Sequence, residues 1–144
     1  MKQELKKKQN NCFFFCGLLI VFANIIIGGE IIKPLCLFWK IGKIVFFKQK
    51  CYENAVSKFS EYFSYYFGSS NIFSITNIRY MKKFYCCFPI YYEELNRLDF
   101  EHYKLLVNIN ENEERYFYFR LAMFCRSSVL ELKDIIKNDY YNLI

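Results

Sequence analysis

The longest hydrophobic pattern in the chain is residues 12–29, which read CFFFCGLLIVFANIIIGG and carry no charged side chain. Three lysines stand just before this run, and Glu30 closes it. A helix of this length spans about 27 Å at about 1.5 Å per residue. That is just enough for a hydrocarbon core of about 30 Å. The pattern predicts a hydrophobic helix that either spans a membrane or packs against other subunits of an assembly.

Two later segments show the periodicity of helices that bury one face. Apolar residues recur three and four apart from Ala55 to Phe67, which is the spacing of one helix face. Ser128 and Glu131 form a capping-box pattern, in which each side chain accepts a hydrogen bond from the backbone of the other residue. These patterns predict one helix over 55–67 and a second helix that begins at Ser128 and stops near Asn138.

Other apolar segments are short, or apolar on both faces, and these features favour strands. β-branched and aromatic residues dominate them. The predicted strands and extended stretches are 43–48, 73–88, 104–109, 116–125 and 140–144. Residues 91–106 fit either a helix or an irregular arm that leads into the third of these strands.

The order of elements after residue 42 predicts an α+β fold. Strand, helix, strand, strand, helix, strand is the ferredoxin-like split βαβ pattern (βαββαβ), with two helices on one face of an antiparallel sheet. Residues 1–42 form a separate region, made of a basic N-terminus, the hydrophobic and possibly membrane-spanning helix, and a connector over 31–42. The α+β domain then covers 43–144.

Composition adds a hint about origin. Aromatic residues make up 22% of the chain, with 17 Phe and 13 Tyr, which is unusual for a globular domain. Phe, Tyr, Ile, Asn and Lys are all read from A/T-rich codons, so the composition is typical of a strongly A/T-biased genome. We therefore expect a mitochondrial protein encoded in the organelle, located on the matrix ribosome or in the inner membrane.

The net charge of +6 is unevenly distributed along the chain. Residues 1–50 are rich in lysine, whereas residues 89–119 are rich in acidic residues. A basic half suits anionic partners such as lipid headgroups or RNA phosphates, although solvated surface lysine gives the same pattern. Basic and aromatic residues alternate in two runs, and the candidate contacts there are Lys43, Lys48, Lys50, Arg79, Lys82 and Lys83.

Catalytic and metal-binding patterns are missing from the sequence. His102 is the single histidine, no phosphate-binding loop is present, and the paired acids at 93–94 and 113–114 read as solvated loop residues. The seven cysteines contain no C-x-x-C pair, which favours small buried hydrophobic residues in a reducing compartment. We therefore predict a protein that is not an enzyme and uses no cofactor and no metal.

The domain after residue 42 resembles the universal small-subunit ribosomal protein family S-ten. The resemblance lies in residues 44–67, in Phe88-Pro89-Ile90, which stand where the family has a G-P-I-P turn, and in the strand 117–120 that ends in Arg120. The resemblance implies an RNA-binding role in which Lys43, Lys48, Lys50, Arg97, Arg115 and Arg120 contact RNA or neighbouring proteins.

Three functions remain open at this point. The first is a structural, non-catalytic constituent of an organellar small ribosomal subunit, with rRNA and neighbouring ribosomal proteins as partners. The second is a single-span accessory subunit of a mitochondrial inner-membrane respiratory or ATP-synthase complex, with lipid and hydrophobic subunits as partners. The third is a secreted or membrane-anchored protein. In each of the first two, the chain is not a free monomer.

Overall fold

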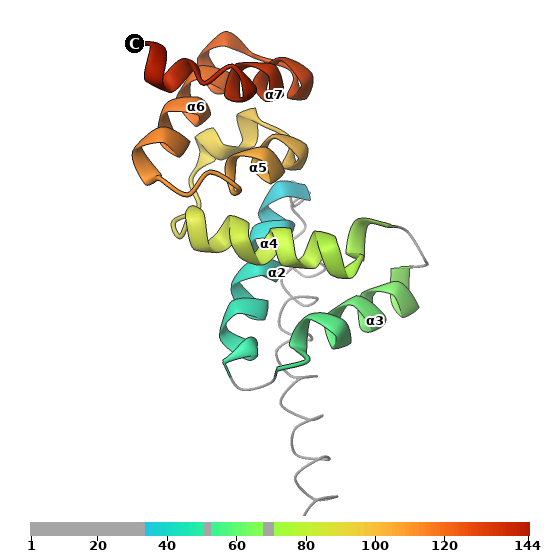
Figure 1. Cartoon of the computed structure of the whole chain (residues 1–144). Helices are drawn as coiled ribbons and strands as arrows, with labels where there is room; N and C mark the ends of the chain where they lie inside the picture. Colours follow the sequence, from blue (N-terminus) through green and yellow to red (C-terminus); the bar gives the residue numbers. More distant parts are fainter. Residues whose placement is uncertain (1–33, 51–52, 68–70) are drawn as a thin grey trace, which may run out of the picture. The chain divides into compact units, whose positions relative to one another are not determined.

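The computed structural model describes residues 34–50, 53–67 and 71–144, and the regular elements in these ranges are helices (Figure 1). The described residues belong to one compact unit, Pro34–Ile144. The α-helices are α2 (Pro34–Gln49), α3 (Ala55–Phe67), α4 (Ile75–Cys87), α5 (Phe100–Leu106), α6 (Asn112–Cys125) and α7 (Val129–Lys137). Short 3₁₀ helices are η1 (Asn71–Phe73), η2 (Glu93–Arg97) and η3 (Tyr140–Leu143).

The predicted ferredoxin-like α+β fold is wrong. No strand occurs in the part of the chain that the structure describes, so no sheet can be built from it. The predicted strand 43–48 lies inside α2, the extended stretch 73–88 is mostly α4, and 116–125 is the greater part of α6. The last predicted strand, 140–144, is largely the 3₁₀ helix η3.

The periodicity of burial explains why these segments are helices. On α6 the buried residues are Arg115, Tyr118, Phe119 and Ala122, which lie three and four apart. On α4 they are Ile78, Met81 and Phe84. A strand would bury alternate residues instead. Burial of every third or fourth residue requires the helical period, and this tertiary demand overrides the β propensity of the aromatic side chains.

The most extensive helix contact described is the crossing of α2 and α4 (Figure 1). Gly42 lies at the crossing, where a Cβ atom would overlap the carbonyl group of Met81. Ile41 and Val45 on α2 are buried beside this point, as is Ile78 on α4. Helix α3 contacts both helices.

The second packing centre lies between the C-terminal end of α4 and the helices α5 and α6. The Phe84 and Tyr103 rings are 4.4 Å apart between centroids, and the Phe88 and Phe119 rings are 5.6 Å apart. The Tyr103 hydroxyl donates a hydrogen bond of 2.7 Å to the carbonyl of Leu95, which anchors η2 on α5. These rings belong to a hydrophobic cluster that extends as far as Leu132 on α7.

Two predicted helices are confirmed. Helix α3 runs from Ala55 to Phe67, as the periodicity predicts. Helix α7 begins with the predicted capping box: the backbone N–H of Glu131 donates to the Ser128 hydroxyl at 3.2 Å, and the backbone N–H of Ser128 donates to the Glu131 carboxylate at 2.6 Å. An apolar face in α3 and a capping box in α7 are both visible in the sequence, so it was sufficient to predict these two helices.

None of the helices in 34–50, 53–67 and 71–144 is long and apolar enough to cross a membrane. The hydrophobic run 12–29 lies outside the described residues, and its helix stays a prediction.

Candidate nucleic-acid interface

A stripe of alternating rings and lysines follows one side of α2. Trp39, Lys43, Phe46 and Lys50 are spaced four, three and four residues apart, so they share one side of the helix and its C-terminal end. The Lys43 ammonium lies 5.4 Å from the centre of the Trp39 ring. The Lys50 ammonium lies 4.8 Å from the Phe46 ring and 5.5 Å from the Phe47 ring. At these distances each cation is attracted to the face of its ring.

Tyr85 on α4 continues this surface across the helix crossing. Its ring centroid lies 5.3 Å from that of Trp39 and 5.5 Å from that of Phe46. The Trp39 indole N–H also donates a 2.7 Å hydrogen bond to the carbonyl of Phe88, so the ring is held in a fixed position. Phe47, at the other end, remains 49% exposed.

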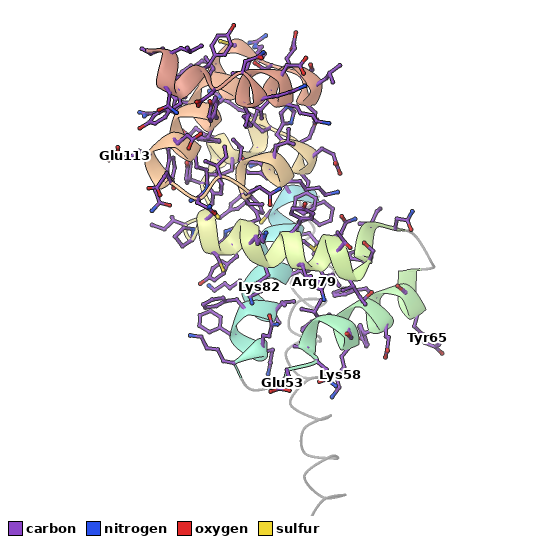
Figure 2. The ribbon with its side chains drawn as sticks, viewed as in Figure 1. Glu53, Lys58, Tyr65, Arg79, Lys82 and Glu113 are labelled. Carbon is purple, nitrogen blue, oxygen red and sulfur yellow. The ribbon has the colours of Figure 1, made fainter. Side chains whose placement is uncertain are left out.

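Helix α4 carries three further cations, Arg79, Lys82 and Lys83. Arg79 and Lys82 lie on the same edge of α4 (Figure 2). Lys83 is exposed; its ammonium donates to the Asn108 side chain at 3.4 Å and lies 5.8 Å from the Tyr80 ring. Arg79, Tyr80, Lys83 and Thr76 line a shallow hollow of about 210 Å³. We call the cations Lys43, Lys50, Arg79, Lys82 and Lys83, with the rings of Trp39, Phe46, Phe47 and Tyr85, the basic face.

The two helices that carry the basic face supply no acid of their own to compensate its charge. Neither α2 nor α4 contains an aspartate or a glutamate. Within the described residues, none of the five cations forms an ion pair, whereas Lys104 on α5 pairs with Glu101 at 2.7 Å. A cluster of cations without carboxylates creates a positive potential that attracts anions.

Five of the nine cations that the sequence analysis singled out lie on α2, at its C-terminal end or on α4, and these are the cations of the basic face. Lys48 is half-buried on α2. Arg97 is exposed at the end of η2, and Arg120 is exposed on α6. Arg115 is only 5% exposed, and its guanidinium donates to the carbonyls of Ile109 and Asn110 within the fold.

The aromatic half of the basic face was missed as a set. Trp39 fell in a predicted connector, and Phe46 and Phe47 fell in a predicted strand, where neighbours point to opposite faces. The signal that could have found them is the spacing of Trp39, Lys43, Phe46 and Lys50. This spacing is meaningful only when the segment is read as a helix.

His102 serves the fold in this structure. Its Nδ1 accepts a hydrogen bond from the backbone N–H of Asp99 at 3.2 Å, which requires the tautomer with the proton on Nε2. Nε2 then donates to the carbonyl of Ser127 at 2.9 Å. Nδ1 thus helps to cap the N-terminus of α5, while Nε2 ties α5 to the connection between α6 and α7. The ring borders a hollow of about 600 Å³ that is also lined by Arg97 and Arg126.

The described cysteines are free thiols, and two of them are more exposed than the sequence analysis expected. Cys86 and Cys125 are exposed, whereas Cys36 and Cys87 are half-buried. Burial raises the pKa of both thiols at the end of α4, and the Lys82 charge partly opposes this rise at Cys86. In the ranges that the structure describes, no three His, Cys, Asp or Glu side chains are grouped so that they could hold a metal ion.

Comparison with known proteins identifies a family for this chain. The family model described as the DUF1016 N-terminal domain matches residues 31–143. No curated protein and no solved structure matches the chain. The family match shows that the resemblance to ribosomal protein S-ten is wrong, because the two families are unrelated. The comparisons therefore give no support to a mitochondrial ribosomal protein or to a membrane-complex subunit.

Proposed function

We propose that this chain, which belongs to the DUF1016 N-terminal domain family, binds nucleic acid through the basic face of α2 and α4. One observation carries the proposal: five cations without carboxylate partners lie on two tightly packed helices or at the end of one, and two of them, Lys43 and Lys50, lie over aromatic rings. Lysine and arginine neutralise phosphates and release their counterions, which supplies most of the affinity of non-specific binding.

The spacing along α2 supports a contact with several phosphates. Lys43 and Lys50 are two helical turns apart, which corresponds to about 10 Å along the helix axis. A duplex of that length carries about six phosphate charges, since it has one charge per about 1.7 Å. Arg79, Lys82 and Lys83 add a second row on α4. Two rows of fixed cations suit the regular backbone of a nucleic acid better than a fluid lipid surface.

The rings give the basic face a second way to contact nucleic acid. Aromatic side chains stack on unpaired bases, whereas a duplex keeps its bases stacked inside and offers mainly phosphates. Phe47 is the most exposed of the four rings. Binding to duplex and to single strands therefore distinguishes a contact made by cations alone from one that also uses stacking.

The experiment measures binding of the full chain to fluorescently labelled duplex DNA, duplex RNA and single strands of equal length, by anisotropy at several salt concentrations. If the five cations each contact one phosphate of a DNA duplex, the logarithm of the binding constant should fall with the logarithm of salt with a slope of about −4.5. Vesicles of anionic lipid are tested alongside. Binding to vesicles without binding to any nucleic acid would refute the proposal.

Two double variants with the same change in net charge locate the interface. In the first, Lys43→Gln and Lys82→Gln remove cations of the basic face; in the second, Lys133→Gln and Lys137→Gln remove exposed cations of α7. The first should weaken binding and reduce the salt slope by about 2, one unit for each lost phosphate contact. The second should leave the slope unchanged. Equal effects of the two doubles would mean that net charge, not the basic face, drives the interaction.

A further inference from the structure

The outer side of α6 carries a second stripe with a different pattern. Glu113, Phe117, Arg120 and Phe124 are spaced four, three and four residues apart, so they lie along one side of the helix. Glu113 and Arg120 are exposed, and Phe124 is 71% exposed. Figure 2 shows Glu113 at the outer edge of α6, directed away from the neighbouring helices. Within the described residues, neither charge is ion-paired.

An open hollow of about 410 Å³ lies between the two charges. It is lined by Asn112, Glu113, Tyr116, Phe117, Arg120 and Tyr141. The Phe117 ring packs against Tyr141 at 5.4 Å between centroids, and the backbone N–H of Tyr141 donates to the Tyr118 hydroxyl at 3.1 Å. The apolar floor of the hollow is thus held in place by η3. The result is a half-buried aromatic centre with an acid at one end and a base at the other.

We propose that this stripe, which we call the α6 seam, is where two copies of the chain associate, with their α6 helices antiparallel. A two-fold interface uses the same surface of both copies. If one residue contacts a second residue of the other copy, that second residue contacts the first in return, so the surface must be complementary to itself. Antiparallel pairing across Phe117 sets Glu113 of each copy against Arg120 of the other. The aromatic centres then meet at the axis.

The charge pattern selects a second copy over other occupants. A partner with charges of one sign would leave either Glu113 or Arg120 opposed by a like charge or unpaired. A fitting partner needs an acid and a base two helical turns apart, about 10 Å, with an apolar centre between them. The chain itself provides that pattern in reverse order when it is turned by the two-fold axis. The ion pairs fix the register and the partner, while burial of the rings supplies the affinity.

The test uses charge reversal in the full chain and measures association by analytical ultracentrifugation. Glu113→Arg places a cation opposite Arg120 of the other copy, so two cations meet at each end of the α6 seam. Arg120→Glu places an acid opposite Glu113 of the other copy, so two acids meet at each end. Each single variant should dissociate at least about tenfold more readily than the wild type. An equimolar mixture of the two variants should associate again, because each copy then meets the opposite charge. The chain that carries both substitutions should also recover self-association.

Several controls keep the result interpretable. Lys133→Glu, a charge change at an exposed site on α7, should leave association unchanged. Circular dichroism checks that each variant is folded, and Glu113→Gln with Arg120→Gln provides a milder pair. Association through another surface, such as the apolar residues 12–29, would not respond to the charges on α6. A monomeric wild type at high concentration, or single variants that associate as the wild type does, would overturn the proposal.

Discussion

Arg115 shows what a cation can do when the fold buries it. No carboxylate contacts its guanidinium, which instead donates to neutral oxygens: Nε to the carbonyl of Ile109 at 3.0 Å and Nη1 to the Asn112 side chain at 2.6 Å. The charge therefore closes the turn between α5 and α6. The resemblance to the S-ten family had marked Arg115 as a contact for a partner. Whether an arginine faces solvent or a turn depends on tertiary packing, which the sequence pattern did not contain.

Tyr103 is the buried residue whose ionisation most directly opposes folding. Burial raises its pKa above the usual value near 10, and burial likewise raises the pKa of Tyr91 to about 12. Above pH 10 the unfolded chain loses these phenolic protons first, so it binds fewer protons than the folded chain does. The contribution of these tyrosines to the free energy of unfolding is therefore fully present below pH 10 and falls as the pH rises from 10 towards 12.

We expect Tyr103→Phe to change this alkaline loss in a measurable way. The variant keeps the ring but leaves the carbonyl of Leu95 without its 2.7 Å hydrogen bond, so it should lose about 1 kcal/mol at pH 8. Its further loss between pH 8 and 11 should be smaller than that of the wild type. Urea unfolding at both pH values measures the difference. Tyr140→Phe, at an exposed site, is the control, and an alkaline loss equal to that of the wild type would contradict the assignment to Tyr103.

At the scale of elements, two of the six described α-helices could be predicted from the sequence, because each is defined by a pattern within its own segment. Helix α3 has a clear apolar face, and α7 has its own capping box. Helices α2, α4 and α6 are rich in aromatic and β-branched residues, and α2 and α6 are apolar around much of their circumference. A short apolar run fits a buried strand and a buried helix equally well. Their state was decided by contacts between helices.

The basic face could likewise be predicted only in part, because it depends on contacts between helices. Its cations were visible in the sequence, because Lys and Arg stand out in runs that contain no acid. The grouping of those cations with Trp39 and Tyr85 depends on the crossing of α2 and α4, which joins residues far apart in the chain. That crossing in turn depends on Gly42, so one small residue positions the rings and the cations on both helices.

The Gly42→Ala substitution should therefore have an effect opposite to the usual one. Replacing glycine by alanine inside a helix normally stabilises it by up to about 1 kcal/mol. Here the new methyl group would overlap the Met81 carbonyl, and the helices would have to move apart, so we expect a loss of about 2–3 kcal/mol.

Urea unfolding of Gly42→Ala beside Lys43→Ala provides the measurement. Lys43 is the next residue along α2 and is exposed, so its substitution should change stability by no more than about 0.5 kcal/mol. Stabilisation by Gly42→Ala would show that α2 and α4 do not approach as closely as described.

At the scale of the whole molecule, charge divides the described residues into two parts. Residues 34–88 carry an excess of cations, whereas 89–144 carry more acids than bases. Like charges thus gather on α2 and α4, which hold the basic face, while the α6 seam lies in the acidic part. The two proposed interactions therefore use different helices and opposite electrostatic environments. Binding of nucleic acid and association of two copies can be disrupted separately by the variants described above.

Packing, in contrast to charge, is continuous across the described residues, and this predicts one cooperative unfolding transition. One hydrophobic cluster includes Leu35 on α2, Phe88 after α4 and Leu132 on α7. Trp39, the single tryptophan, is hydrogen-bonded to Phe88 at the junction, so its fluorescence reports on α2 and α4. Circular dichroism at 222 nm reports on all helices. In urea the two signals should give the same midpoint and slope, as they do for single domains of this size.

Leu132→Ala, which creates a cavity on α7, should shift both midpoints together. A transition seen by circular dichroism after Trp39 has already changed, or a Leu132→Ala effect confined to one signal, would show that α5–α7 unfold independently of α2–α4.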